Sequence, residues 1–339
     1  MPTAPFAIQA LTDASRPADL VRTIQDRHVE LEQALLRHGV LRFRGFALRT
    51  PQDVEDVVLA LDPNLASGEY LGTSPRNALT KHVHSASELP GYYPIPLHCE
   101  MSFLAHPPTR LYFSCLQPSS WGGETPLCDF RLVWRDLNPD VRSRLQTRGI
   151  RIVRNYAGPK TPRSLDPFAL KRWDDLFGTT DRDAIAATCA REALTAEWLD
   201  DDALRLTCTP PVVRSHPETG EPVYFSHLQV FEVHTPEAEL RRVSRLRQTL
   251  HARLWYLAGR AVTTWTRRTK APHRRAMDVT HADGSQIALS DVEHVRDVIW
   301  QHQVVAPWQL GDFVVIDNRS TAHGRLPYSG PRQVVIAWR

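Results

Sequence analysis

From residue 91 onward, short apolar segments rich in strand-forming residues recur along the chain, separated by turn residues. Three of them read "TRLYFSCLQP", "ETPLCDF" and "GIRIVRNY". Many short strands cannot bury their apolar faces singly, so they must pack together as a sandwich or a barrel. We therefore expect a mainly β fold, with a sandwich or barrel core and helices clad around it.

Helices are expected near the N-terminus. Residues 17–38 carry apolar side chains at helical spacing. The segment "VLRFRGF" at 40–46 alternates apolar and basic residues, as a half-buried strand does. Thr50 is followed by a proline and then by Asp53, which is the pattern of a capped helix start. That helix should run to about Leu61.

Turn residues divide the rest of the chain. The segment "HPETGEPVYF" at 216–225 predicts a hairpin that turns at its Thr-Gly pair, and "THADGSQI" at 280–287 contains an Asp-Gly turn. The last stretch, residues 309–339, contains two apolar strands joined by a Gly- and Pro-rich connection. These strands belong to the expected core.

Two further helices are predicted between the strands. The segment "LVWRDLNPDVRSRLQTRG" at 132–149 has a helical pattern. Ser290 and Glu293, three residues apart, form a capping-box pattern for a helix over 291–302.

The composition excludes several classes of protein. Apolar residues make up 42% and charged residues 23%, which is typical of folded globular domains. The net charge of +3 is too small to indicate a nucleic-acid-binding protein. No apolar run is long enough for a membrane span, and the N-terminus lacks the pattern of a signal peptide. Five cysteines without a CxxC pair suit a reducing compartment, so we expect a soluble cytoplasmic protein.

One segment departs from this average composition. Residues 240–275 contain 11 Lys or Arg residues and no Asp or Glu. Because the whole chain has 41 basic and 38 acidic residues, the remainder has 30 basic against 38 acidic. The segment is therefore a basic helical insert, at about 235–278, on an acidic body. It is either a solvated helical face, a lid over a site, or a docking surface for an acidic partner.

His98 and Glu100 stand two positions apart in "PIPLHCEMSF", in what reads as a strand. Side chains at positions i and i+2 of a strand point to the same side. Two histidines and one carboxylate on one face form the iron site of non-haem Fe(II) oxygenases. His323, in what reads as a polar turn, "DNRSTAHGR", after an apolar strand, is the candidate for the second histidine.

Two other residues favour a bound dicarboxylic co-substrate. Arg332 follows His323 by nine residues, and a guanidinium can hold a carboxylate with two hydrogen bonds. Thr125 lies 25 residues after Glu100, in "GGETP", and its hydroxyl could join Arg332 at that carboxylate. Taken alone, Arg332 could be a surface charge at a hairpin and Thr125 an ordinary turn residue.

The combination "LHCEMSF", "GGETPLCD" and "VIDNRSTAHGRLPYSGPRQVV" resembles the taurine dioxygenase/clavaminate synthase superfamily of Fe(II)- and 2-oxoglutarate-dependent oxygenases. The resemblance extends over most of the chain and is greatest to the branch of antibiotic pathways that contains amino-acid hydroxylases. It implies a single oxygenase domain over residues 1–339 with a double-stranded β-helix (jelly-roll) core.

The resemblance also implies roles for individual residues. His98, Glu100 and His323 would bind Fe(II), and Thr125 and Arg332 would hold 2-oxoglutarate, with O2 as the oxidant. A glutamate in place of the commoner aspartate fits the clavaminate synthase-like members. Related halogenases lack this carboxylate, so halogenation is not expected.

The substrate is expected to be a small molecule: an amino acid, free or tethered to an acidic carrier protein that docks at 240–275, or a peptide-like intermediate. His227, Gln229 and Arg325 are candidate substrate contacts. Relatives often have "FNQ" where this chain has "FSH" at 225–227, so this substrate-facing position has changed. The sequence predicts no nucleic-acid or membrane partner and leaves the oligomeric state open.

Hydroxylation is the expected outcome, but desaturation, epoxidation and cyclisation use the same residues. Two readings from other classes remain open at this point. The first is a carrier-binding module without turnover, and the second is a metal-dependent hydrolase or cupin-type isomerase that uses the three metal ligands without 2-oxoglutarate.

Overall fold

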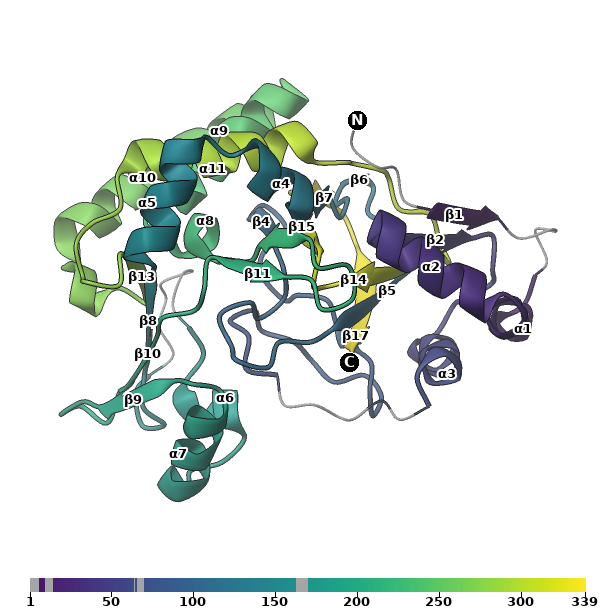
Figure 1. Cartoon of the computed structure of the whole chain (residues 1–339), viewed down its shortest axis with the longest axis horizontal. Helices are drawn as coiled ribbons and strands as arrows, with labels where there is room; N and C mark the ends of the chain where they lie inside the picture. The colour runs from purple at the N-terminus through teal and green to yellow at the C-terminus, as the bar shows by residue number, and fades with distance from the viewer. Residues whose placement is uncertain (1–5, 10–14, 64, 66–69, 163–169) are drawn as a thin grey trace.

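The computed structural model describes residues 6–9, 15–63, 65, 70–162 and 170–339 (Figure 1). A six-stranded sheet runs through the middle of the molecule in the order β1-β2-β14-β5-β17-β3. Only its β1–β2 pair is parallel. Its strands are β1 (Phe6–Gln9), β2 (Val40–Arg44), β3 (His84–Ser85), β5 (Arg110–Gln117), β14 (Phe313–Asp317) and β17 (Gln333–Trp338).

The N-terminal helices cover one face of this sheet. They are α1 (Pro17–Asp26), α2 (His28–His38) and α3 (Pro51–Leu61). Their apolar side chains form one buried cluster with outward-facing sheet residues such as Phe43, Tyr112 and Phe313. The predicted helix from Thr50 to Leu61 is confirmed, and the Thr50 hydroxyl accepts a hydrogen bond from the Asp53 amide at 3.1 Å.

The predicted continuous helix over 17–38 is wrong in one respect. It breaks at Arg27, whose backbone angles of φ −111° and ψ 20° are not helical. The break lets α1 pack against α3 while α2 packs on the sheet.

A second, smaller sheet faces the other side of the large one. It has the order β4-β15-β7 and is continued by the pair β16–β6, and all of these pairs are antiparallel. The ring of Phe113, on β5, lies 5.1 Å from the ring of His323, on β15, so the two sheets are in contact. The strands are β4 (Ile95–His98), β6 (Trp121–Gly122), β7 (Leu127–Asp129), β15 (Thr321–Arg325) and β16 (Tyr328–Ser329).

The inner face of the large sheet is apolar. Leu111, Phe113 and Cys115 alternate along β5 with the outward-facing residues and join one buried cluster. The same cluster takes in the inner residues of the neighbouring strands: Val40, Val314, Ile316, Val334, Ile336 and Trp338. This layer excludes water from the space between the two sheets.

The far end of the molecule holds a third sheet, in the order β13-β8-β10-β9, and the hairpin β11–β12 lies nearer the middle (Figure 1). The hairpin and the positive φ of 71° at Gly220 confirm the turn predicted at 216–225. The strands are β8 (Arg151–Tyr156), β9 (Thr195–Trp198), β10 (Leu204–Cys208), β11 (Val213–Ser215), β12 (Pro222–Tyr224) and β13 (Met277–Thr280).

Most of the remaining helices gather at that end (Figure 1). The basic segment contains α9 and α10 and a short 3-10 turn, η1. The full set is α4 (Phe130–Asp136), α5 (Pro139–Arg148), α6 (Trp173–Phe177), α7 (Arg182–Arg191), α8 (Leu228–Phe231), α9 (Thr235–Arg247), α10 (Leu250–Thr269), η1 (Pro272–Arg274) and α11 (Leu289–His302). In the described part of the chain, no helix is long and apolar enough to cross a membrane.

Two helix predictions need correction. The helix expected over 132–149 is split into α4 and α5, because Pro139 starts a new helix that Asn138 caps. The capping box expected at Ser290 and Glu293 does not form, since α11 begins at Leu289 without a side-chain cap.

The fold is thus mixed helix and sheet with many antiparallel strands. It is less strand-rich than the mainly β prediction, since helices contribute more residues than strands. The apolar space between the two facing sheets is where the candidate site lies.

Candidate metal centre

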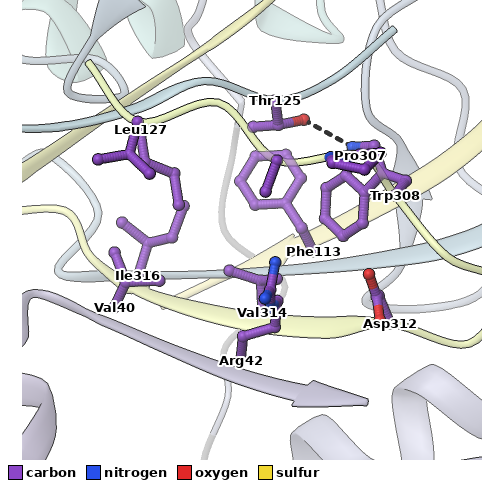
Figure 2. Close-up of a pocket in the computed structure, with 12 residues that line it drawn as sticks. Val40, Arg42, Phe113, Thr125, Leu127, Pro307, Trp308, Asp312, Val314 and Ile316 are labelled. Atoms are coloured by element: carbon purple, nitrogen blue, oxygen red, sulfur yellow. Dashed lines mark hydrogen bonds between the residues drawn. The ribbon is translucent and has the colours of Figure 1, made fainter. Parts of the chain in front are cut away.

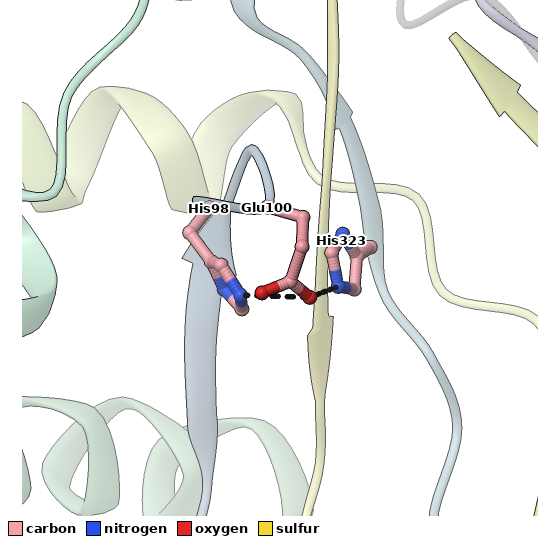
Figure 3. A group of neighbouring side chains, drawn as sticks. All are labelled: His98, Glu100 and His323. Atoms are coloured by element: carbon pink, nitrogen blue, oxygen red, sulfur yellow. Dashed lines mark ion pairs between the residues drawn. The ribbon is translucent and has the colours of Figure 1, made fainter. Parts of the chain in front are cut away.

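His98, Glu100 and His323 come together in the structure as predicted from the sequence (Figure 3). His98 is the last residue of β4 and pairs directly with His323 in the antiparallel β4–β15 ladder. One potential ligand atom from each of the three residues lies within 4.8 Å of the others. Glu100 Oε2 is 3.6 Å from His323 Nε2 and 4.0 Å from His98 Nε2. His323 was expected in a turn but lies in a strand, and this pairing is what places its ring beside His98.

The protonation of these groups suits metal binding. His98 Nδ1 donates to the Pro96 carbonyl at 2.8 Å, which leaves the lone pair of Nε2 directed at the centre. Burial, followed by the neighbouring His323, lowers the pKa of His98 to about 4, so its imidazole is neutral at pH 7. Two imidazoles and one carboxylate, all buried, are the donor set that fits Fe(II).

Glu100 is held as a carboxylate by charge. Burial acts to raise its pKa, but the Arg76 guanidinium and His323 outweigh burial and hold the pKa well below the ordinary range. Arg76 Nη2 lies 2.6 Å from Glu100 Oε2, and the Tyr70 hydroxyl donates to Glu100 Oε1 at 3.3 Å. Hydrogen bonds of this kind orient ligand carboxylates in metal sites.

The main chain at Glu100 is clamped by Asn318, a fully buried residue between β14 and β15. Its Oδ1 accepts from the Glu100 amide at 2.6 Å, and its Nδ2 donates to the Glu100 carbonyl at 3.0 Å. The next residue, Met101, has a left-handed φ of 52°. The clamp therefore holds a tight turn and connects Glu100 to the segment that carries His323.

Arg76, Tyr70 and Asn318 were not predicted as site residues. Asn318 stands in "DNRSTAHGR", the same segment as His323, so its closeness in sequence to a predicted ligand indicated a place near the site. Arg76 and Tyr70 lie in a segment without regular secondary structure, and no spacing rule connects them to Glu100.

Thr125 lies just before β7, the strand that pairs with the strand of His323. It precedes Leu127, the cross-strand partner of His323, by two residues. Thr125 and Leu127 line a cavity of about 30 Å³ between the two sheets, together with Phe113 (Figure 2). The Thr125 hydroxyl accepts a hydrogen bond from the Trp308 indole at 3.1 Å.

Arg332 is held by the segment that precedes Thr125. Its Nε donates to the Gly123 carbonyl at 2.9 Å, two residues before Thr125. Gly123 has a φ of 73°, and a Cβ there would lie 3.0 Å from the Arg332 side chain, so only glycine permits this approach. Arg332 does not line the small cavity with Thr125, but it contacts the segment that carries Thr125. Burial lowers the pKa of its guanidinium, and a bound anion would offset this cost of desolvating the charge.

The three predicted substrate contacts have different surroundings. His227 is buried beside the centre, with its ring 5.2 Å from that of His98 and its Nδ1 2.6 Å from the Ser102 hydroxyl. Gln229 instead donates to the Leu97 carbonyl at 2.8 Å and accepts from the Tyr224 hydroxyl at 2.9 Å.

Arg325 braces a loop. Its two terminal nitrogens donate to the main-chain carbonyls of Leu89, Pro90 and Tyr93 at 2.8 to 3.0 Å. Of the three residues, His227 alone packs against a predicted metal ligand in the described structure. The substrate roles of all three stay predictions.

Comparison with known proteins gives a consistent result. A family model described as taurine catabolism dioxygenase TauD, TfdA family, matches residues 8–338. The chain is 27% identical to the dapdiamide synthesis protein DdaC of Enterobacter agglomerans over 312 residues, covering 91% of this chain and 84% of that protein. It is 26% identical to a clavaminate synthase-like protein of Arabidopsis thaliana over 341 aligned residues, covering 99% and 91%.

Among solved structures, the PvcB protein of Pseudomonas aeruginosa shares the fold. The TM-score is 0.51 at 14% sequence identity, covering 99% of this chain and 87% of that one.

Proposed function

The chain belongs to the taurine catabolism dioxygenase TauD/TfdA family and is therefore a non-haem Fe(II)- and 2-oxoglutarate-dependent dioxygenase, and we propose that it hydroxylates an aliphatic C–H bond of an amino acid or a peptide-like intermediate. The observation that carries this proposal is the buried group of His98, Glu100 and His323. In the proposal these three side chains hold the iron.

When bound, the iron and 2-oxoglutarate couple the reduction of O2 to release of succinate and CO2 and to oxidation of a C–H bond. The side chains prepare and shelter the place where this occurs. Neutral His98 presents a lone pair, ionised Glu100 supplies the negative charge, and the Asn318 clamp fixes the turn between β4 and the ligand carboxylate. The apolar inner face of the large sheet keeps water away.

Thr125 and Arg332 are proposed to hold the far carboxylate of 2-oxoglutarate. Arg332 uses Nε for the Gly123 carbonyl, and its two terminal nitrogens make no hydrogen bond to the described part of the protein. A pair of terminal N–H groups can grip a carboxylate side-on. The Thr125 hydroxyl lies between the sheets, and the indole of Trp308 orients it as a further donor to that carboxylate.

The two facing sheets are proposed to be the halves of a double-stranded β-helix. The contact between Phe113 and His323, the apolar layer between the sheets and the fold shared with PvcB support this. Residues 1–339 are then one oxygenase domain, with 235–278 as a helical insert.

An amino-acid-like substrate is supported by the relatives. One is named for dapdiamide synthesis and another for its likeness to clavaminate synthase. Desaturation, epoxidation and cyclisation use the same residues, and identification of the product distinguishes these reactions from one another.

The carrier-tethered form of the substrate is supported by an exposed face of α10. Three of the four arginines of α9 pair within the protein: Arg241 with Glu293, Arg242 with Asp297, and Arg247 with Glu124. The arginines of α10, by contrast, form no ion pair in the described part of the chain; they are Arg253, Arg260, Arg267 and Arg268.

Apolar side chains stand between these unpaired arginines. Leu250, Leu254, Leu257 and Trp265 are 52 to 71% exposed and recur at helical spacing along one stripe of α10. An apolar stripe whose neighbouring charges are all positive fits a partner that is acidic and partly apolar. The same positive charges repel a second copy of the stripe. In the proposal, the occupant is an acidic carrier protein that bears the substrate.

The docking surface has a direct test. In one variant, Arg253 and Arg260 are both changed to Glu, and in the matched control the exposed Arg22 and Lys81 are changed in the same way. We expect KM for a carrier-tethered substrate to rise at least about tenfold in the first variant only, with free substrates unaffected. Equal KM values in wild type and both variants would contradict docking on α10.

The function itself is tested by product mass. The enzyme is incubated with Fe(II), 2-oxoglutarate and O2 and with a panel of amino acids, each supplied free and carrier-tethered. A gain of one oxygen atom supports hydroxylation, and a loss of two hydrogens indicates desaturation or ring closure instead. A metal-dependent hydrolase would keep its activity after Arg332→Ala, whereas the proposed dioxygenase would lose most of its 2-oxoglutarate turnover.

A further inference from the structure

A cavity of about 830 Å³ is lined by Arg76, whose guanidinium also donates to the predicted metal ligand Glu100 at 2.6 Å. Its size suits a small molecule. Its walls come from segments far apart in the sequence: residues 73–77 and 88–89, residues 155–162, residues 170–175, and the end of α10 with η1 up to residue 276. None of the residues proposed above to hold iron or 2-oxoglutarate lines it.

The lining of this cavity is positively charged. It includes five basic side chains, Arg76, Lys171, Arg172, Lys270 and Arg274, and two acidic ones, Glu88 and Asp175. Asp175 is already paired with Arg172 at 3.4 Å. Arg76 is paired with Glu100. Even without Lys270, the remaining Lys171 and Arg274 outnumber Glu88, which favours an anionic ligand.

Arg76 lines this cavity, and two of its hydrogen-bond donors are unused. Its side chain is 5% exposed, and only its Nη2 is paired, with Glu100. Its Nε and Nη1 are buried without a partner in the described structure. Buried donors without an acceptor are rare in folded proteins, so an acceptor from a ligand is expected here.

Lys171 is the second cation at this wall. Its ammonium lies 5.6 Å from the centroid of the Tyr70 ring, on which Arg76 also stacks at 4.5 Å. Lys171 forms no salt bridge within the described residues, and burial lowers the pKa of its ammonium. Two cations therefore meet on the one tyrosine whose hydroxyl donates to Glu100.

We propose that this cavity is the substrate site and that Arg76 and Lys171 receive an anionic group of the substrate, a carboxylate or a phosphate. This inference rests on the proposed function and names its substrate class as acidic. The anion sits one guanidinium away from the metal centre, which leaves the rest of the substrate to extend toward the iron. A carboxylate would come from a free amino acid or acid, and a phosphate from the pantetheine arm of a carrier.

The test uses pairs of probes that differ in one charge group: leucine with leucinamide for an α-carboxylate, glutamate with glutamine for a side-chain carboxylate, and phosphopantetheine with pantetheine for a phosphate. Each probe is titrated calorimetrically, without oxygen, into the enzyme loaded with Fe(II) and 2-oxoglutarate. Wild type is compared with Lys171→Gln, with the charge-preserving Lys171→Arg, and with Lys160→Gln, a matched change at an exposed lysine outside the cavity.

We expect the anionic member of at least one pair to bind wild type roughly 10- to 100-fold more tightly than its neutral partner, the usual worth of a charged hydrogen bond. Lys171→Gln should remove that advantage, whereas Lys171→Arg and Lys160→Gln should keep it. The pair whose anionic member binds more tightly shows whether the group recognised is a carboxylate or a phosphate.

Two results would overturn the inference: no anionic probe binding more tightly than its neutral partner, or a charge preference that survives Lys171→Gln. The binding of Fe(II) and 2-oxoglutarate is measured in the same samples. If that binding is absent in wild type, it is the proposed function that fails.

Discussion

The metal centre and the adjoining cavity are built in opposite ways. The centre takes two of its three residues from β4 and β15, which pair in register, and the third from a turn that Asn318 clamps. The cavity takes its walls from loops and helix ends, and two of its cations retain unused binding capacity. If the two proposals hold, the reactive centre is fixed by a sheet, whereas selection of the substrate is left to segments that can vary without disturbing it.

Removal of a predicted metal ligand tests the metal centre. We expect His323→Ala to lower turnover at least about a thousandfold, because the ligands act as one unit. The control is His106→Ala, at a histidine whose side chain is 71% exposed. Iron content after gel filtration is measured along with succinate production. Full iron content in His323→Ala would show that the ligand set is wrong.

Loss of Arg332 should have a smaller and more specific effect. We expect Arg332→Ala to raise KM for 2-oxoglutarate roughly 10- to 100-fold, because it removes charged hydrogen bonds to a carboxylate. Iron binding should be unchanged, since Arg332 does not contact the three ligands. A steady-state titration of 2-oxoglutarate gives KM, and an unchanged value would place the co-substrate elsewhere.

Arg76 belongs to both regions and can separate them. Arg76→Gln removes the charge that holds the Glu100 carboxylate, so iron affinity should fall roughly 10- to 100-fold, as for other partners of ligand carboxylates. Arg76→Lys retains the charge and should lose less. The measurement is competition for Fe(II) with a chelator. Equal affinity in wild type and both variants would make Arg76 a residue of the cavity alone.

The Asn318 clamp should contribute to stability as well as to geometry. Asn318→Ala leaves the Glu100 amide and carbonyl without their partners, which should cost about 2 to 3 kcal/mol of unfolding free energy. Asn318→Asp keeps the acceptor but sets a buried carboxylate oxygen against the Glu100 and Pro108 carbonyls, so its loss should be at least as large. Urea denaturation of the metal-free protein measures both, and a wild-type value for Asn318→Ala would remove the clamp from this account.

The smallest expected effect concerns pH. Burial acts to raise the pKa of Asp317, but the His216 hydrogen bond outweighs burial and lowers it below the ordinary value of 3.8. Because the folded pKa is depressed, the stabilisation is complete above the unfolded pKa and is lost as pH falls through the folded value. In Asp317→Asn, the free energy of unfolding should therefore fall less steeply with decreasing pH below about pH 4. An unchanged pH dependence would contradict this.

The sequence predicted the parts of the site that follow from local rules. His98 and Glu100 were recognised by their strand spacing and His323 by its polar segment, although β15 was taken for a turn because its residues are not apolar. Arg76, Tyr70 and Lys171 were not predicted, because segments without periodicity bring them to Glu100 from a distance. The split helix over 132–149 was missed although its Asn-Pro pair was visible.

The most direct test of the central claim is a reaction in isotopically labelled dioxygen, with any panel member that is turned over. The account predicts that one labelled oxygen atom enters succinate and the other enters the product, in equal amounts. Product oxygen that derives from water, or turnover that proceeds without 2-oxoglutarate, would contradict the claim that His98, Glu100 and His323 form the centre of a 2-oxoglutarate-dependent hydroxylase.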